Sequence, residues 1–244
     1  MSTIEKINAL RQLAEGINPT IIYNEGWMIR LLVIESMIEK LNVGWIDFEL
    51  LTTKKWTSEA QISSPFEGAE LKKHDKYEKK THADIILGDF DINYEREKKR
   101  TEIMIKPHPR VLGIIEAKMG SGLSTGIKNA SKYNQASRSI CCLANVTKEN
   151  PECEIFFAIV APKTKINDQK SKFIDQIGAV KTEIEDRFKV AEKEYTSEMR
   201  KKVENCKRPI ISYEDWIGKI KDNDVKEALN KFYAACKTYN NIKD

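Results

Sequence analysis

Short apolar segments that carry charged residues constrain this fold more than any other feature of the sequence. Residues 82–92, 111–119 and 154–161 are rich in Ile, Leu, Val and Phe, and no apolar run approaches the ~18–20 residues that a bilayer span needs. Short apolar runs bounded by turn signals predict buried β-strands. The chain is therefore expected to fold around a central sheet.

The composition is that of a globular protein. Of the 244 residues, 41% are hydrophobic and 32% are charged, which allows one sizeable core and excludes disordered, collagen-like and fibrous classes. Residues 1–10 lack the apolar stretch of a signal peptide, and the five cysteines form no Cys-x-x-Cys pair. We therefore expect a cytoplasmic protein with reduced thiols and no membrane partner.

Helical periodicity surrounds the apolar segments. Helices are expected at 2–16, at 24–41 with Asn24 as N-cap, from the glycine-rich loop 120–126 to about 142, across 173–206 as one helix or a broken pair, and at 225–236. Further strands are expected at 43–52, 102–105 and 210–212. This order predicts a single α/β domain over 1–244 with a mixed central sheet.

Two of the expected strands carry charges where burial is costly. Asp84 stands directly before an Ile-Ile-Leu run, and Glu116 and Lys118 close the most apolar strand. Glu-x-Lys occurs four times in this lysine-rich chain, but only here does it end an apolar segment. Side chains alternate along a strand, so Glu116 and Lys118 share a face. Burying these charges costs little free energy only if they pair with one another or bind a ligand. We therefore expect all three side chains in one cleft.

Two carboxylates held side by side offer a hard oxygen pocket that suits Mg²⁺. Asp84 and Glu116 would be its ligands, together with the backbone carbonyl of Ala117 and water. Lys118 would position or help to deprotonate a water molecule and stabilise developing negative charge. Phosphodiester hydrolysis needs this set of groups.

These residues resemble the signature of the PD-(D/E)XK nuclease superfamily, an acid on one strand followed by Glu-x-Lys on the next. The expected helix and strand order over about 20–162 is similar to that family's restriction-endonuclease-like αβββαβ core, with 163–244 as a helical extension. The resemblance implies a Mg²⁺-dependent nuclease, with Mn²⁺ as a substitute, that acts on double-stranded DNA in restriction or phage defence. An inactive nucleic-acid-binding or assembly subunit, an RNase and a homodimer stay open as alternatives.

The resemblance also implies two supporting residues. Glu25, early in a helix, matches the family's helix-borne acid, with Glu35 on the same helix as the fallback. Gln135 matches the polar helix residue that orients the catalytic lysine. The chain departs from the family in having Ala83 where proline is frequent, and no tyrosine four residues after Gln135. Without that tyrosine, the sequence does not support membership of the family's exonuclease-like branch, which carries a Gln-x-x-x-Tyr motif.

A basic excess in residues 91–208 fits a polyanionic partner, although the margin is within what ordinary surfaces show. The expected nucleic-acid contacts are Lys106, Arg110, Lys128, Lys132 and Arg138.

Structural explanations compete with these roles. Asp84 and Lys118 would form an ion pair between strands, Glu25 would favour a helix N-terminus, and Gln135 would be an ordinary exposed residue.

Overall fold

The computed structural model describes residues 1–51, 55–68, 71, 77, 78, 80–95, 100–126 and 130–242. Its helices are α1 (Thr3–Gly16), η1 (Pro19–Ile21), α2 (Glu25–Glu39), η2 (Glu49–Leu51), α4 (Gln135–Thr147), α5 (Lys163–Gly178), α6 (Val180–Ala191), α7 (Ser197–Asn205), α8 (Tyr213–Lys219) and α9 (Asn223–Tyr239). Its strands are β1 (Lys55–Ile62), β2 (Thr81–Gly88), β3 (Phe90–Glu95), β4 (Arg100–Ile105), β5 (Val111–Ala117), β6 (Glu154–Ala161) and β7 (Ile210–Ser212).

The strands of the described residues form one mixed seven-stranded sheet in the order β3-β4-β1-β2-β5-β6-β7. Strands β1, β2 and β5 are antiparallel neighbours, whereas β5, β6 and β7 run parallel. The β3–β4 hairpin lies between β2 and β5 in the sequence but pairs with the far side of β1. The α/β class with a mixed sheet is therefore confirmed.

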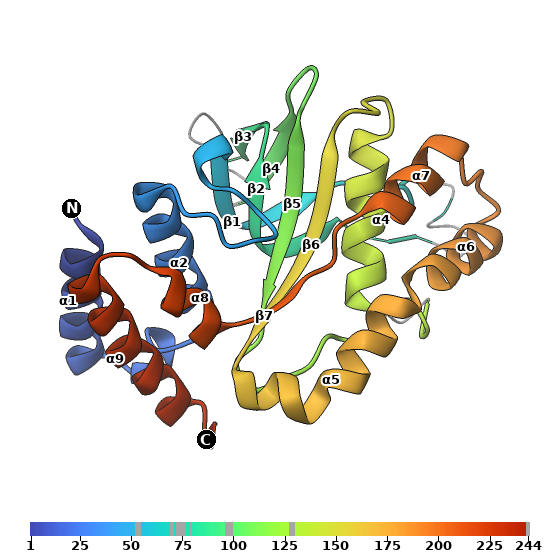
Figure 1. The fold of residues 1–244 in the computed structure, drawn as a ribbon. Helices are drawn as coiled ribbons and strands as arrows, with labels where there is room; N and C mark the ends of the chain where they lie inside the picture. The colour runs from blue at the N-terminus through green and yellow to red at the C-terminus, as the bar shows by residue number, and fades with distance from the viewer. Residues whose placement is uncertain are drawn as a thin grey trace.

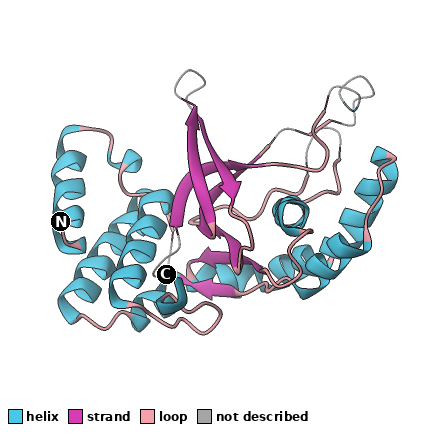
Figure 2. Cartoon of the chain, turned by 90° about the horizontal axis from the view of Figure 1, so that it is seen from above, coloured by secondary structure: helices cyan, strands magenta, loops and turns pink. Residues whose placement is uncertain are grey.

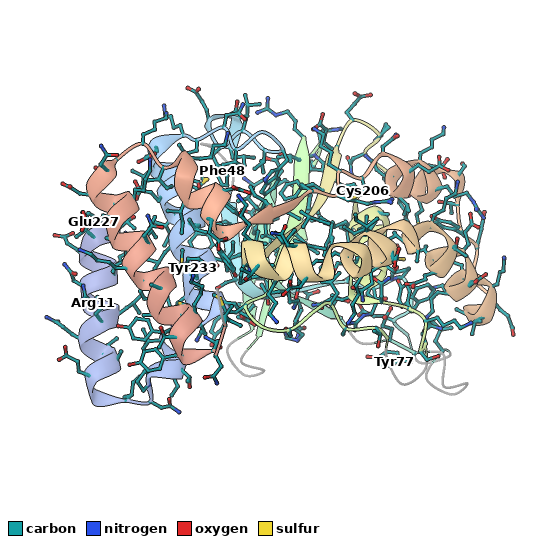
Figure 3. The ribbon with its side chains drawn as sticks, turned by 60° about the horizontal axis from the view of Figure 1, so that its bottom comes forward. Arg11, Phe48, Tyr77, Cys206, Glu227 and Tyr233 are labelled. Atoms are coloured by element: carbon teal, nitrogen blue, oxygen red, sulfur yellow. The ribbon has the colours of Figure 1, made fainter. Side chains whose placement is uncertain are left out.

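Helices cover both faces of this sheet (Figure 1). One face packs on α1, α2, α8 and α9, and the other packs on α4, α6 and α7, each with its own cluster of buried hydrophobic residues. The view from above shows the strands between the two helical layers (Figure 2). Figure 3 shows Arg11 and Glu227 on the outer side of α1 and α9, whereas Phe48 and Tyr233 are buried.

Several expected elements are present with close to their expected bounds. Strand β6 occupies 154–161 and β7 occupies 210–212, as the apolar pattern predicts. Helix α2 begins after Asn24, whose side chain accepts a hydrogen bond from Trp27 N at 3.0 Å. The predicted N-cap at Asn24 is therefore confirmed.

The prediction of a strand at 43–52 is wrong. These residues form turns, an isolated bridge between Asn42 and Asp47, and the short helix η2. The first strand is instead β1, in a stretch where no strand was expected. Its residues are largely half-buried or exposed, so backbone pairing with β2 rather than apolarity places β1 in the sheet.

The apolar segment 82–92 is two strands rather than one. Gly88 ends β2 with a positive φ of 143°, and a Cβ at this position would lie 2.2 Å from Val111 O. Only glycine tolerates both conditions. The turn directs β3 away from β2 toward β4, whose expected strand is present.

The helices after β5 also differ from expectation. Helix α4 begins at Gln135 instead of directly after residue 126, because Asn134 caps it through Ser137 N at 3.0 Å. The long periodic stretch from 173 to 206 belongs to three helices, with a break at Ala179 and a left-handed Glu192 at φ 53°. No helix in the described ranges is long and apolar enough to cross a membrane.

The packing of β5 against β6 predicts that Gly113→Ala destabilises the protein. A Cβ on Gly113 would lie 2.2 Å from the ring of Phe156, which is held by Trp45 at a centroid distance of 5.3 Å. Overpacking of this kind costs about 1–3 kcal/mol. Gly218→Ala is the control, because nothing lies within 4 Å of its added Cβ. Urea unfolding of both variants checks the prediction, and equal stabilities would contradict it.

Candidate active site

The charged residues of β2 and β5 meet at the end of β5. The β2–β5 ladder stops at the pair Ile85–Ile115, so the next two residues, Asp84 and Glu116, stand opposite each other where the strands are no longer paired. Asp84 Oδ2 instead accepts a hydrogen bond from Ala117 N at 2.8 Å. A side-chain carboxylate thus replaces a strand carbonyl at this point.

Lys118 lies within the same group of charges. Its Nζ donates to Glu116 Oε1 at 2.7 Å, and both side chains are almost fully buried. Its backbone N–H donates to Val160 O at 2.8 Å, so β6 holds the residue in an extended conformation beyond β5. The expected convergence of Asp84, Glu116 and Lys118 is therefore present.

Gln135 approaches this group from α4. Its Nε2 donates to the same Glu116 Oε1, and its own Oε1 accepts from Ser124 N at 3.3 Å. Gln135 is the first residue of α4, so the Asn134 cap fixes its position. Glu116 Oε1 thus accepts two hydrogen bonds, whereas the buried Oε2 has no partner among the described residues.

Glu25 approaches from the opposite helical layer. Its Oε2 accepts from Met119 N at 2.7 Å, which ties the first residue of α2 to the chain just after Lys118. The preceding turn is held by α9, because Asn240 Nδ2 donates to Tyr23 O at 2.9 Å and the rings of Tyr23 and Tyr239 stack at 5.2 Å. The first turns of α2 and α4 therefore flank the site from opposite faces of the sheet.

Two acids of the site, Glu116 and Glu25, are hard to ionise in this arrangement. Burial raises the pKa of Glu116 to about 8, and the charge of Asp84 adds to the rise while Lys118 opposes it. Burial also raises the pKa of Glu25. For Lys118, burial acts to lower the pKa, but Glu116, Asp84 and Glu25 together raise it. The site therefore carries more carboxylates than one ammonium group neutralises.

The structure distinguishes Glu25 from its alternative Glu35. Glu35 is buried on another side of α2, where burial and the charges of Glu39 and Asp222 raise its pKa. The charged groups that raise its pKa, Glu39 and Asp222, lie outside the site. Glu25 is the helix-borne acid that the geometry places at the site.

The expected nucleic-acid contacts fall into two groups. Arg138 lies near the site, since its Nη2 donates to Ser124 Oγ at 2.7 Å, and Lys132 is exposed shortly before α4. Lys106 and Arg110 instead precede β5. Measured along the strand, Arg110 lies about 20 Å from Glu116. Lys128 lies outside the described residues.

The site residues suit a divalent cation in two respects: they supply oxygen ligands, and one buried oxygen lacks a hydrogen-bond donor. Asp84 and Glu116 supply hard oxygens, and the unpartnered Oε2 is an acceptor without a donor. The N–H and C=O of one strand residue point to the same side, so the Ala117 carbonyl faces Asp84. Within the described residues no cluster of three or more His, Cys, Asp or Glu side chains is arranged as a metal site. The set here is two carboxylates and one carbonyl.

Two charged residues near the site escaped the sequence analysis. Arg30 of α2 donates from Nη2 to Glu59 Oε1 at 3.3 Å, and Glu59 adds its charge to the surroundings of Glu25. Neither lies in an apolar strand or in a recognisable motif. The one available signal is that helix α2 contributes both Glu25 and Arg30.

Comparisons with protein-family models, with curated proteins and with solved structures gave no match to this chain.

The raised pKa of Glu116 predicts a pH-dependent stability in the absence of metal. The folded protein holds this proton more tightly than the unfolded chain, whose pKa is near 4.5. The stabilisation is therefore full below about pH 4.5 and is lost as the pH rises toward about 8. Thermal melts in EDTA at about pH 5.5 and about pH 8.5 should show a larger loss of Tm for wild type than for Glu116→Gln. An equal loss in both would contradict the prediction.

Proposed function

We propose that this chain is a divalent-metal-dependent nuclease that hydrolyses phosphodiester bonds of DNA. The observation that carries the proposal is the convergence of Asp84, Glu116 and Lys118 at the end of β5, with a buried Glu116 Oε2 that has no partner among the described residues. Ionising the buried Glu116 beside the half-buried Asp84 is costly unless a cation balances the two charges. The same groups are those that phosphodiester hydrolysis requires.

The topology supports a restriction-endonuclease-like fold, which is part of the proposal. Helix α2, the antiparallel strands β1, β2 and β5, helix α4 and the parallel strand β6 follow in the order that the resemblance to the PD-(D/E)XK superfamily implies. The β3–β4 hairpin is an insertion between the second and third of these strands. Asp84 and Glu116 lie on the strands where that family carries its acids.

The side chains divide the work. Asp84, Glu116 and the Ala117 carbonyl would hold Mg²⁺ or Mn²⁺. When bound, the ion polarises a phosphoryl oxygen and lowers the pKa of a coordinated water. Lys118 keeps its proton because the surrounding acids raise its pKa, so it orients the water and stabilises negative charge rather than acting as a base.

Glu25 and Gln135 position these groups. Gln135 and Lys118 both donate to Glu116 Oε1, which leaves Oε2 free to face a cation. Glu25 fixes Met119 N and thereby the backbone that follows Lys118. Both are placed through other residues of the site and are positioning residues.

Cleavage assays test the proposal directly. Purified protein is incubated with plasmid, linear duplex, single-stranded DNA and RNA in Mg²⁺, Mn²⁺ or EDTA. We expect DNA cleavage with either metal and none in EDTA. Cleavage of RNA alone would make the protein an RNase, and binding without cleavage in any metal would make it a binding subunit.

The site variants should lose rate without losing DNA binding. Asp84→Asn removes an anionic ligand, and Lys118→Ala removes charge stabilisation, each costing on the order of a hundredfold or more in rate. Lys202→Ala is the matched control, because Lys202 is also buried but donates to the carbonyls of Pro151 and Cys153. Thermal melts in Mg²⁺ verify folding first. Full activity in Lys118→Ala would overturn the assigned role.

DNA affinity should depend steeply on salt, because phosphate contacts release counterions. The position of Arg138 beside Ser124 predicts that Arg138→Ala weakens binding and reduces the salt slope by about 1. Arg110→Ala should have a smaller effect because Arg110 lies at the opposite end of β5. Fluorescence anisotropy of a labelled duplex at several salt concentrations measures both. Larger losses for Arg110→Ala would place the DNA on another surface.

A further inference from the structure

A second positively charged side chain, that of Arg30, lies beside the acidic site. No motif in the sequence indicates this arrangement. Arg30 of α2 donates from Nε to Ser58 Oγ at 2.9 Å and from Nη2 to Glu59 Oε1 at 3.3 Å. The Arg30 side chain is only 20% exposed, whereas that of Glu59 is 62% exposed. The guanidinium is therefore held by two hydrogen bonds and largely buried, but its anionic partner lies largely in water.

The backbone of β1 places this pair next to Asp84. Glu59 has a φ of 54° inside the strand, a conformation that non-glycine residues rarely adopt. The β1–β2 pairs run from Ser58–Ile85 to Ala60–Ala83 and omit the position between them, where Glu59 stands opposite Asp84. Strained residues of this kind cluster at functional sites.

The same irregularity changes which face the strand presents. Ile85 belongs to the core beside α2, whereas Ala83, two residues earlier, belongs to the core beside α4. Residues two apart in a regular strand share a face, so the alternation breaks at Asp84. The break turns Asp84 toward the site and leaves Glu59 beside Arg30.

The guanidinium of Arg30 lies close to the start of its own helix. Its Cζ lies 5.2 Å from the centre of the Trp27 ring, and a Cβ on Gly26 would lie 3.2 Å from Nη1. Gly26 follows Glu25 directly, so the N–H donors of the Arg30 guanidinium lie beside the first turn of α2 and the acidic site. A planar guanidinium can donate two parallel hydrogen bonds to the two non-bridging oxygens of a phosphodiester.

We propose that Arg30 binds a phosphate of the DNA strand adjacent to the bond that is cut, and that Glu59 holds Arg30 in place until the phosphate replaces it. This inference rests on the proposed nuclease function. The carboxylate of Glu59 is largely exposed and screened by water, so the ion pair is weak and a phosphate displaces Glu59 at little cost. Lys118 does not serve this purpose, because it is buried against Glu116.

The test compares Arg30→Ala, Arg30→Lys and Glu59→Gln with wild type. Metal-free affinity for a labelled duplex is measured by anisotropy, and cleavage is measured in Mg²⁺. Arg30→Ala should bind about tenfold or more weakly, with a salt slope smaller by about 1. Arg30→Lys should recover part of the loss, and Glu59→Gln should bind at least as tightly as wild type.

Arg200→Ala is the matched control. Arg200 also pairs with a glutamate, Glu185, at 2.8 Å and lies over an aromatic ring, that of Tyr195, at 4.2 Å, but it belongs to α7. Its removal should leave DNA binding unchanged. Thermal melts of all variants verify folding, and Arg30→Lys keeps the test available if Arg30→Ala does not fold.

Duplexes with single neutral methylphosphonate linkages identify the phosphate itself. One linkage next to the cut site should weaken wild type but have no added effect on Arg30→Ala. If wild type cleaves DNA while Arg30→Ala binds as tightly and responds to every linkage as wild type does, this inference is wrong and the proposed function stands. If wild type neither binds nor cleaves any nucleic acid, both are wrong.

Discussion

The hydrogen bond from Ala117 N to Asp84 Oδ2 determines how the sheet ends and what the site contains. It forms where the β2–β5 ladder stops, so the strands remain joined while their backbones separate. The separation brings Asp84 and Glu116 face to face between the first turns of α2 and α4. Without this one bond, the acids would be paired in an ordinary ladder or exposed at a frayed edge.

Burial turns this junction into an electrostatically unbalanced site. One oxygen of Glu116 accepts two hydrogen bonds and the other accepts none from the described residues. The desolvated Glu116 resists ionisation, and Lys118 is the cation buried with it. A site with surplus acceptors and a fixed ammonium is disposed to receive another cation and, through it, an anion.

The central residues of the site could be predicted from the sequence, because they are charged residues in or next to apolar segments. The residues around them could not, because their positions depend on contacts between distant parts of the chain. Glu116 and Lys118 stand out because apolar residues precede them, and β6 is continuous enough to define its own bounds. Strand β1 escaped notice because pairing rather than apolarity holds it. The positive φ of Glu59 and its contact with Arg30 leave no trace in local sequence. Local rules fail where a chain is strained, as is frequent at functional sites.

The clamp between α9 and the start of α2 has a consequence for synthesis of the protein. The hydrogen bond from Asn240 to Tyr23 joins residues 217 positions apart, and Tyr239 stacks on the same tyrosine. The turn that presents Glu25 therefore lacks this support until the ribosome has released residue 240. At the slow pace of translation, the chain spends seconds with β5 complete and the turn before Glu25 not yet held by α9. The support that α9 gives to the acidic site is thus added after the strands that carry Asp84 and Glu116 have been synthesised.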